Sequence, residues 1–72
     1  MMSGRKLTKR QREALEWVAD GKTAQQIALL MGLTVATVEK HLRLARESLG
    51  VETTAQAVLK AAFQNQMFVV DR

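Results

Sequence analysis

Three cationic side chains recur at intervals of three in the segment TVEKHLRLARESLG, residues 37–50: Lys40, Arg43 and Arg46. Ammonium and guanidinium groups bind phosphates, and arginine also binds the acceptor edge of guanine. An acidic residue, Glu39, directly precedes the first cation, where a surface for a polyanion is expected to be positive. The segment is therefore either a nucleic-acid-reading helix with one carboxylate in its binding surface, or a solvated helix with mixed charges.

Glu39 has three possible roles. It precedes Arg43 by four residues, an orientation that stabilises a helix by about 0.2–0.5 kcal/mol, so it could orient that guanidinium. It could instead accept a hydrogen bond from the amino group of cytosine, or form an exposed ion pair with no role in binding. A bidentate arginine on guanine discriminates by about 1–3 kcal/mol, so base reading dominates wherever it occurs.

The helix that must position these side chains has an apolar stripe along one face. The stripe residues follow one another by 4, 3 and 4 positions, a spacing that aligns them on a helix: Val38, Leu42, Ala45 and Leu49. At about 100° per residue, the opposite face carries two cations and their neighbours: Ala36, Lys40, Arg43 and Glu47. Thr37 and His41 are expected at the edge of the core. The cations lie in the N-terminal half, which a recognition helix presents to base edges.

Glycine and threonine divide the chain into four predicted helices. Glycine suits the left-handed position after a helix end, and threonine suits the N-cap of the next helix. The joints fall at Gly21, Gly32 and Gly50, each followed by threonine within a few residues. The sequence therefore predicts an all-α fold with helices at about 8–20, 23–31, 34–49 and 53–66. It shows no strand signal and no internal repeat.

Three of the predicted helix starts match the capping box, in which a threonine and a glutamine three residues later satisfy two backbone donors: Thr8 with Gln11, Thr23 with Gln26, and Thr53 with Gln56. The third helix has Thr37 where glutamate or glutamine would complete the box. Leu33 and Val38 have the spacing of a hydrophobic staple there instead. The short turn 32–34 makes the second and third helices a helix-turn-helix candidate, although any small helical bundle with a tight turn fits that pattern.

Composition limits the class of protein. Seventy-two residues form one small domain. A net charge of +4 and a pI near 10.1 favour an anionic partner. Because there is no cysteine, no apolar run near the roughly 18 residues of a membrane helix and no signal-peptide segment, we expect a cytoplasmic protein. Five basic residues in the first twelve positions form either a solubilising charge run or a phosphate-contacting arm: Arg5, Lys6, Lys9, Arg10 and Arg12.

Residues suited to catalysis or metal binding are sparse. His41 is the sole histidine, and it has neither cysteine nor clustered acids to complete a metal site. No phosphate-binding glycine loop appears, and no nucleophile has a base beside it. Trp17, on a helix with Leu15 and Val18, is expected in the core. We predict no enzymatic activity, no metal and no cofactor.

The fourth predicted helix is apolar over more than half of its circumference: Ala55, Ala57, Val58, Leu59, Ala61, Ala62 and Phe63. One face must pack on the domain, so a surplus remains for a partner. That partner is either the same helix of a second copy, approached closely through small alanines, or a ligand-sensing domain in a longer chain.

Taken together, LTKRQREALEWVADGKTAQQIALLMGLTVATVEKHL, then SLGV and QAV, closely resemble the LuxR-type helix-turn-helix domain of bacterial transcription regulators. The resemblance runs from about Leu7 to Phe68, and leaves 1–6 as a basic N-terminal segment and 69–72 as a C-terminal tail. Trp17 together with GKT at 21–23 resembles the quorum-sensing branch of the family, whose members respond to acyl-homoserine lactones. An upstream ligand-sensing domain is then expected if the chain is part of a longer protein.

The resemblance implies that the third helix enters the major groove of double-stranded DNA and that the fourth pairs two copies into a homodimer. It places three residues at base-contact positions: Glu39, Lys40 and Arg43. Contacts to the DNA backbone are implied for Lys22, Thr23, Thr34, Thr37, His41 and Arg46. The implied dimer interface consists of Ala55, Val58, Leu59, Ala62 and Phe63.

Two residues depart from the family pattern. Gln11 stands where the family almost always has glutamate, and as a neutral substitute it preserves the helix cap. Glu39 replaces a residue that is frequently basic, so the base preference there cannot be transferred from relatives. The predicted function is a sequence-specific DNA-binding domain of a transcriptional regulator. The alternatives are a region-four-like module of an RNA polymerase sigma factor, against which the fourth helix argues, and an antagonist that pairs with a related regulator.

Overall fold

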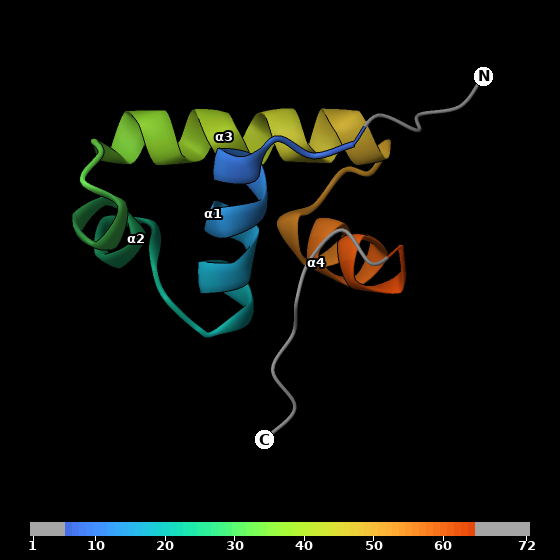
Figure 1. The fold of residues 1–72 in the computed structure, drawn as a ribbon, viewed down its shortest axis with the longest axis horizontal. Coiled ribbons are helices and arrows are strands. Elements are labelled where there is room, and N and C mark those ends of the chain that lie inside the picture. Colours follow the sequence, from blue (N-terminus) through green and yellow to red (C-terminus); the bar gives the residue numbers. More distant parts are fainter. Residues whose placement is uncertain (1–5, 65–72) are drawn as a thin grey trace.

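The computed structural model describes residues 6–64, which form four helices (Figure 1). These are α1 (Lys9–Ala19), α2 (Ala24–Met31), α3 (Val35–Leu49) and α4 (Thr54–Phe63). No strand occurs among the described residues. The predicted all-α fold is confirmed. Arg5 and the rest of 1–5, the predicted continuation of the last helix to Gln66 and the predicted tail 69–72 lie outside the described residues.

Each helix begins one residue later than predicted because the threonine before it is an N-cap in extended backbone conformation. The three predicted capping boxes are confirmed. In the box of α1, the Gln11 amide donates to Thr8 Oγ1 at 3.1 Å, and the Thr8 amide donates to Gln11 Oε1 at 3.2 Å. Gln11 therefore performs the capping role with a neutral side chain, and it is buried.

The N-terminus of α3 uses a different cap. The Thr37 amide donates to Thr34 Oγ1 at 3.2 Å, and the two hydroxyls share a hydrogen bond of 3.0 Å. The Thr37 hydroxyl therefore lies at the position where glutamine stands in the capping boxes of the other three helices. The predicted staple residues, Leu33 and Val38, both pack in the core. At the ends of α2 and α3, Gly32 (φ 69°) and Gly50 (φ 71°) adopt the left-handed conformation that glycine reaches without steric cost.

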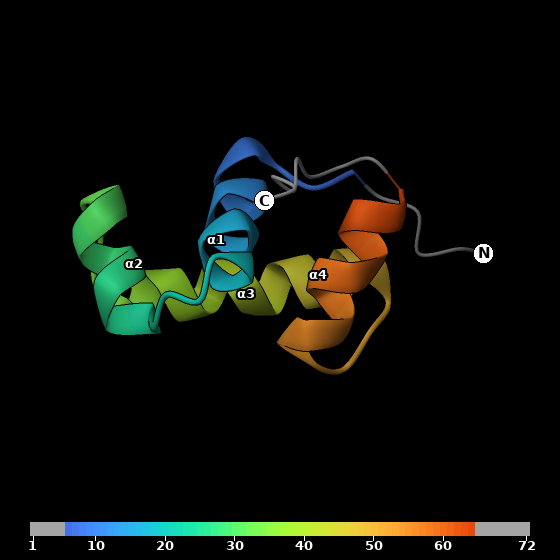
Figure 2. The same cartoon turned by 90° about the horizontal axis from the view of Figure 1, so that it is seen from below.

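Helix α3 lies across one side of the domain, and α1, α2 and α4 pack against its other face (Figures 1 and 2). The predicted stripe of Val38, Leu42, Ala45 and Leu49 is buried as a whole. It meets Leu15 of α1 and Ile27 of α2, which are also fully buried, in one core. Trp17 packs against this core and is partly buried. In the part of the chain that the structure describes, no helix is long and apolar enough to cross a membrane.

Three cationic side chains join one helix to another. Arg10 Nη2 of α1 donates to the Met31 carbonyl at the end of α2, at 3.2 Å. Arg46 Nη1 of α3 donates to Thr54 Oγ1 at the start of α4, at 2.9 Å. Lys60 Nζ of α4 donates to the Leu49 carbonyl at the end of α3, at 2.7 Å. A cation beside the last carbonyls of a helix is also favoured by the helix dipole.

Candidate nucleic-acid interface

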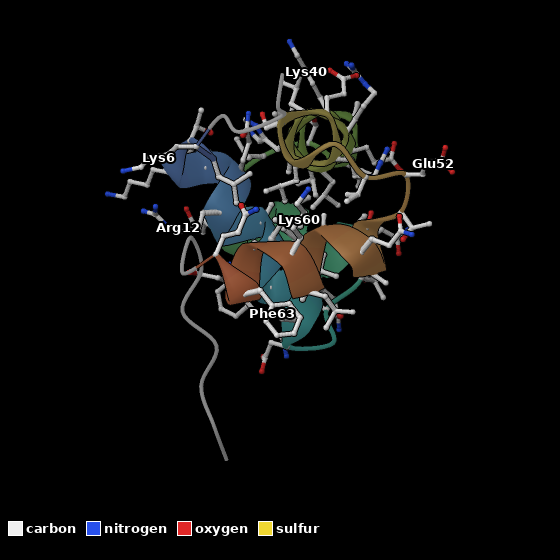
Figure 3. All side chains as sticks on the ribbon, turned by 90° about the vertical axis from the view of Figure 1, so that its right-hand side faces the viewer. Lys6, Arg12, Lys40, Glu52, Lys60 and Phe63 are labelled. Carbon is white, nitrogen blue, oxygen red and sulfur yellow. The ribbon has the colours of Figure 1, made fainter. Side chains whose placement is uncertain are left out.

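The outer face of α3 is exposed and charged. It presents Ala36, Glu39, Lys40, Arg43 and Glu47, all of them exposed. Viewed along α3, Lys40 projects away from the other helices (Figure 3). Because α1, α2 and α4 cover only the opposite face, this side of α3 is open along its length for a partner. We call it the α3 outer face.

Arg43 forms its ion pair with Glu47 and not with Glu39, which was one possible partner from the sequence. Its Nη1 lies 3.2 Å from Oε2 of Glu47, one turn towards the C-terminus, and no pair with Glu39 is formed. Glu39 and Glu47 are each four residues away from Arg43. The two possible ion pairs therefore differ little in energy. The two side chains are 53% and 61% exposed, and an exposed pair of this spacing contributes about 0.3–0.5 kcal/mol. A guanine edge, at about 1–3 kcal/mol, would outcompete that pair.

Glu39 and Lys40 make no side-chain hydrogen bond or ion pair within residues 6–64, where both are exposed. Of the three possible roles of Glu39, the orientation of Arg43 is therefore not seen among the described residues of the unbound domain. Its carboxylate remains available to accept a hydrogen bond, and the Lys40 ammonium remains available to donate one. Direct contact with cytosine stays a prediction for Glu39.

The predicted backbone contacts occupy different environments. Thr37 and His41 are half-buried at the edge of the core, as expected. Thr34 and Thr37 share the cap of α3. Arg46 is half-buried and bonded to Thr54, so it joins α3 to α4 and does not project with the α3 outer face.

Lys22 and Thr23 lie at the start of α2, where they were expected. Lys22 Nζ is 3.7 Å from Asp20 Oδ2 in the preceding turn. Thr23 caps α2, with its hydroxyl accepting from the Gln26 amide at 3.2 Å. The N-terminus of a helix attracts anions through its unpaired amides and its dipole, so a phosphate could be received between Lys22 and the first turn of α2.

The predicted dimer residues divide into two groups. Leu59 and Phe63 are 60% and 84% exposed, Ala55 is exposed as well, and Phe63 lies on the outside of α4 (Figure 3). Val58 and Ala62 are partly buried and pack against the core. The apolar surplus on α4 is thus real, but it is centred on Leu59 and Phe63. We call these two side chains the α4 apolar patch.

Sequence reasoning missed a second group of exposed apolar side chains. Leu29 is 85% exposed, and Leu30 and Val35 are also exposed on either side of the turn between α2 and α3. The signal was present in the sequence, because Ile27, Ala28 and Met31 fill the buried face of α2 and leave Leu29 and Leu30 outside. No group of acids and histidine that could hold a metal ion occurs among the described residues.

The arrangement of α2, the glycine turn and α3 over α1 defines a helix-turn-helix domain. A family described as bacterial regulatory proteins, luxR family, matches residues 5–61. The solved structure of the transcription factor GerE superimposes with a TM-score of 0.82 at 25% identity, covering 89% of this chain and 97% of that one. The chain belongs to the luxR family and is a DNA-binding domain of the type that these transcription regulators carry.

Two transcriptional activators that share this domain are much longer than this chain. The chain is 42% identical over 55 residues to the transcriptional activator protein AnoR of Acinetobacter nosocomialis, which covers 76% of this chain and 23% of AnoR. It is 37% identical over 51 residues to the transcriptional activator protein PhzR of Pseudomonas fluorescens, which covers 71% of this chain and 21% of PhzR. The chain therefore spans less than a quarter of the length of these relatives.

Proposed function

We propose that the domain binds double-stranded DNA sequence-specifically as a homodimer, with α3 in the major groove and α4 between the two copies. The observation that carries this proposal is the α3 outer face, which is exposed along its length and bears Lys40 and Glu39 without partners in the described part of the chain. On this basis Arg43 and Lys40 contact base edges, and Glu39 contacts a cytosine amino group.

Contacts to the DNA backbone then fall near the starts of the two helices of the helix-turn-helix. Lys22 and Thr23 meet a phosphate at the start of α2, and Thr34, Thr37 and His41 meet the backbone near the start of α3. The α4 apolar patch is the natural contact between copies, because its two large side chains are exposed in the single domain.

The wider role follows from the relatives. AnoR and PhzR are transcriptional activators, and we propose that this domain regulates transcription in the cytoplasm. Where it forms part of a longer regulator, a ligand-sensing domain precedes it, as in the quorum-sensing branch that Trp17 and residues 21–23 resemble.

Selection from a random duplex library tests the proposal. We expect the 72-residue chain to select a two-fold symmetric site with half-sites about one helical turn apart. Its affinity for that site, measured by fluorescence anisotropy, should fall steeply with salt because phosphate contacts release counterions. No DNA affinity at low salt would contradict the proposal and favour the interaction-antagonist alternative. Selection of a single asymmetric site would contradict the dimer.

A further inference from the structure

Three cations at the N-terminal end of α1 have no partner among residues 6–64. Lys6 and Lys9 are exposed and Arg12 is half-buried, and no side chain of the three forms an ion pair or hydrogen bond with a described residue. Arg10, between them, differs, because it is bonded to Glu13 Oε1 at 3.0 Å and to the Met31 carbonyl at 3.2 Å. We call Lys6, Lys9 and Arg12 the α1 basic cluster.

This placement is electrostatically unfavourable for the domain alone. The N-terminus of a helix is the positive end of its dipole and favours acidic residues, yet the first turn of α1 contains no acid. Lys9 and Arg12 are also three residues apart, so like charges are neighbours on the helix surface. A bound anion would relieve both repulsions.

The cluster lies beside the α3 outer face. Lys6 and Arg12 lie on one flank of α3 when the molecule is viewed along that helix, and Lys40 projects between this flank and the opposite one, where Glu52 lies (Figure 3). In the view from below, α1 begins well to one side of α3, whereas α2 begins where it overlaps the other edge of α3 (Figure 2). The cations at the start of α1 therefore lie on one flank of α3, and the start of α2 lies at its other edge.

We propose that the α1 basic cluster binds phosphates of one DNA strand, on the side of the major groove opposite the strand met by Lys22 and the start of α2. A helix in the major groove has a sugar-phosphate backbone on each side, across a groove about 12 Å wide. Lys6 and Arg12 of the cluster lie on one flank of α3 (Figure 3), and the cluster has the charge that this backbone requires. This inference rests on the proposed function. It adds contacts to the backbone of the second DNA strand.

The experiment uses the duplex that the wild-type chain selects, with single phosphates replaced by neutral methylphosphonates along both strands. The test variant is Lys6→Gln/Lys9→Gln/Arg12→Gln. A second variant, Lys6→Gln/Lys9→Gln, changes only exposed side chains and so preserves the fold even if Arg12 contributes to packing. The matched control is Lys22→Gln, which removes one charge on the opposite flank. Thermal unfolding followed by circular dichroism verifies that each variant is folded.

We expect the wild-type chain to lose affinity when phosphates on either flank are neutralised. The affinity of the cluster variants should no longer depend on neutralised phosphates of one strand, while it still depends on those of the other strand. The affinity of Lys22→Gln should show the reverse pattern. The slope of log K against log salt should fall by about 0.9 for each phosphate that a variant no longer binds, while the selected base sequence stays the same.

Two results separate this inference from the function on which it rests. Wild-type chain that binds no DNA overturns the proposed function. Wild-type chain that binds, with cluster variants as sensitive as wild type to every neutralised phosphate, overturns the α1 contact alone.

Discussion

Helices α3 and α4 differ in what they leave exposed. Each follows a threonine N-cap, and each buries one apolar face in the common core. The exposed side of α3 carries Glu39, Lys40 and Arg43, whereas that of α4 carries Leu59 and Phe63. The buried faces hold the domain together, and the exposed faces suit different partners: a charged polymer for α3 and an apolar surface for α4.

The largest effect is expected from Phe63→Glu, which places a charge in the α4 apolar patch. If α4 pairs the two copies, the variant binds each half-site separately and loses the gain from joint binding, about 10²–10⁴-fold. The measurement is the ratio of affinities for duplexes with two half-sites and with one.

Leu29→Glu is the matched control for Phe63→Glu, because Leu29 is equally exposed on the other apolar group. It should leave that ratio unchanged. A ratio that collapses in Leu29→Glu and persists in Phe63→Glu would move the dimer contact to the turn between α2 and α3.

The next largest effect is expected from Arg43→Ala on the α3 outer face. Removing a bidentate guanine contact costs about 1–3 kcal/mol and relaxes the preference at one base pair. The control is Glu47→Ala, which removes the partner of Arg43 in the free domain but leaves its guanidinium in place. Equal losses of affinity for selected and random DNA in Arg43→Ala would assign Arg43 to the phosphates.

Arg46→Ala tests the bond between the two helices. Without its hydrogen bond to Thr54, the free energy of unfolding should be lower by about 0.5–1.5 kcal/mol in urea titrations. If Arg46 acts only within the protein, the salt dependence of DNA binding remains that of the wild type. A slope smaller by about 0.9 would instead confirm the predicted contact with one backbone phosphate.

Glu39→Gln should have the smallest effect on affinity, less than about fivefold, equivalent to about 1 kcal/mol. The carboxylate is repelled by phosphates and gains from a cytosine amino group, so the two terms oppose each other. The informative measurement is a repeated site selection, in which we expect the preference to change at one position. An unchanged consensus would show that Glu39 takes no part in base reading.

Features that depend on residues three or four apart were predictable from the sequence. The capping boxes, the buried stripe of α3 and the apolar surplus of α4 all follow from helix periodicity and local hydrogen bonding. The luxR-family resemblance supplied the roles of the helices, which periodicity alone left open.

Features that join distant positions were not predictable in this way. Arg46 and Thr54 are eight residues apart, Lys60 and Leu49 eleven, and Arg10 and Met31 twenty-one. Each pair joins two different helices, so the periodicity within one helix does not relate them. The division of α4 was missed for a similar reason, since packing against the core decides that Val58 and Ala62 turn inwards. Arg43 pairs with Glu47 and not with Glu39. Because both acids are four residues from Arg43, the sequence pattern does not distinguish the two pairs.

The bonds from Arg46 to Thr54 and from Lys60 to the Leu49 carbonyl hold α3 and α4 at both ends of the short 50–53 connection. These two hydrogen bonds constrain the orientation of α4 relative to α3. Under the proposed function, in which α4 pairs the copies and α3 reads the bases, the distance between the two α3 helices depends on the packing of the α4 pair, and the bases recognised depend on α3. Operator spacing and operator sequence can then change independently, through substitutions on different helices of the same domain.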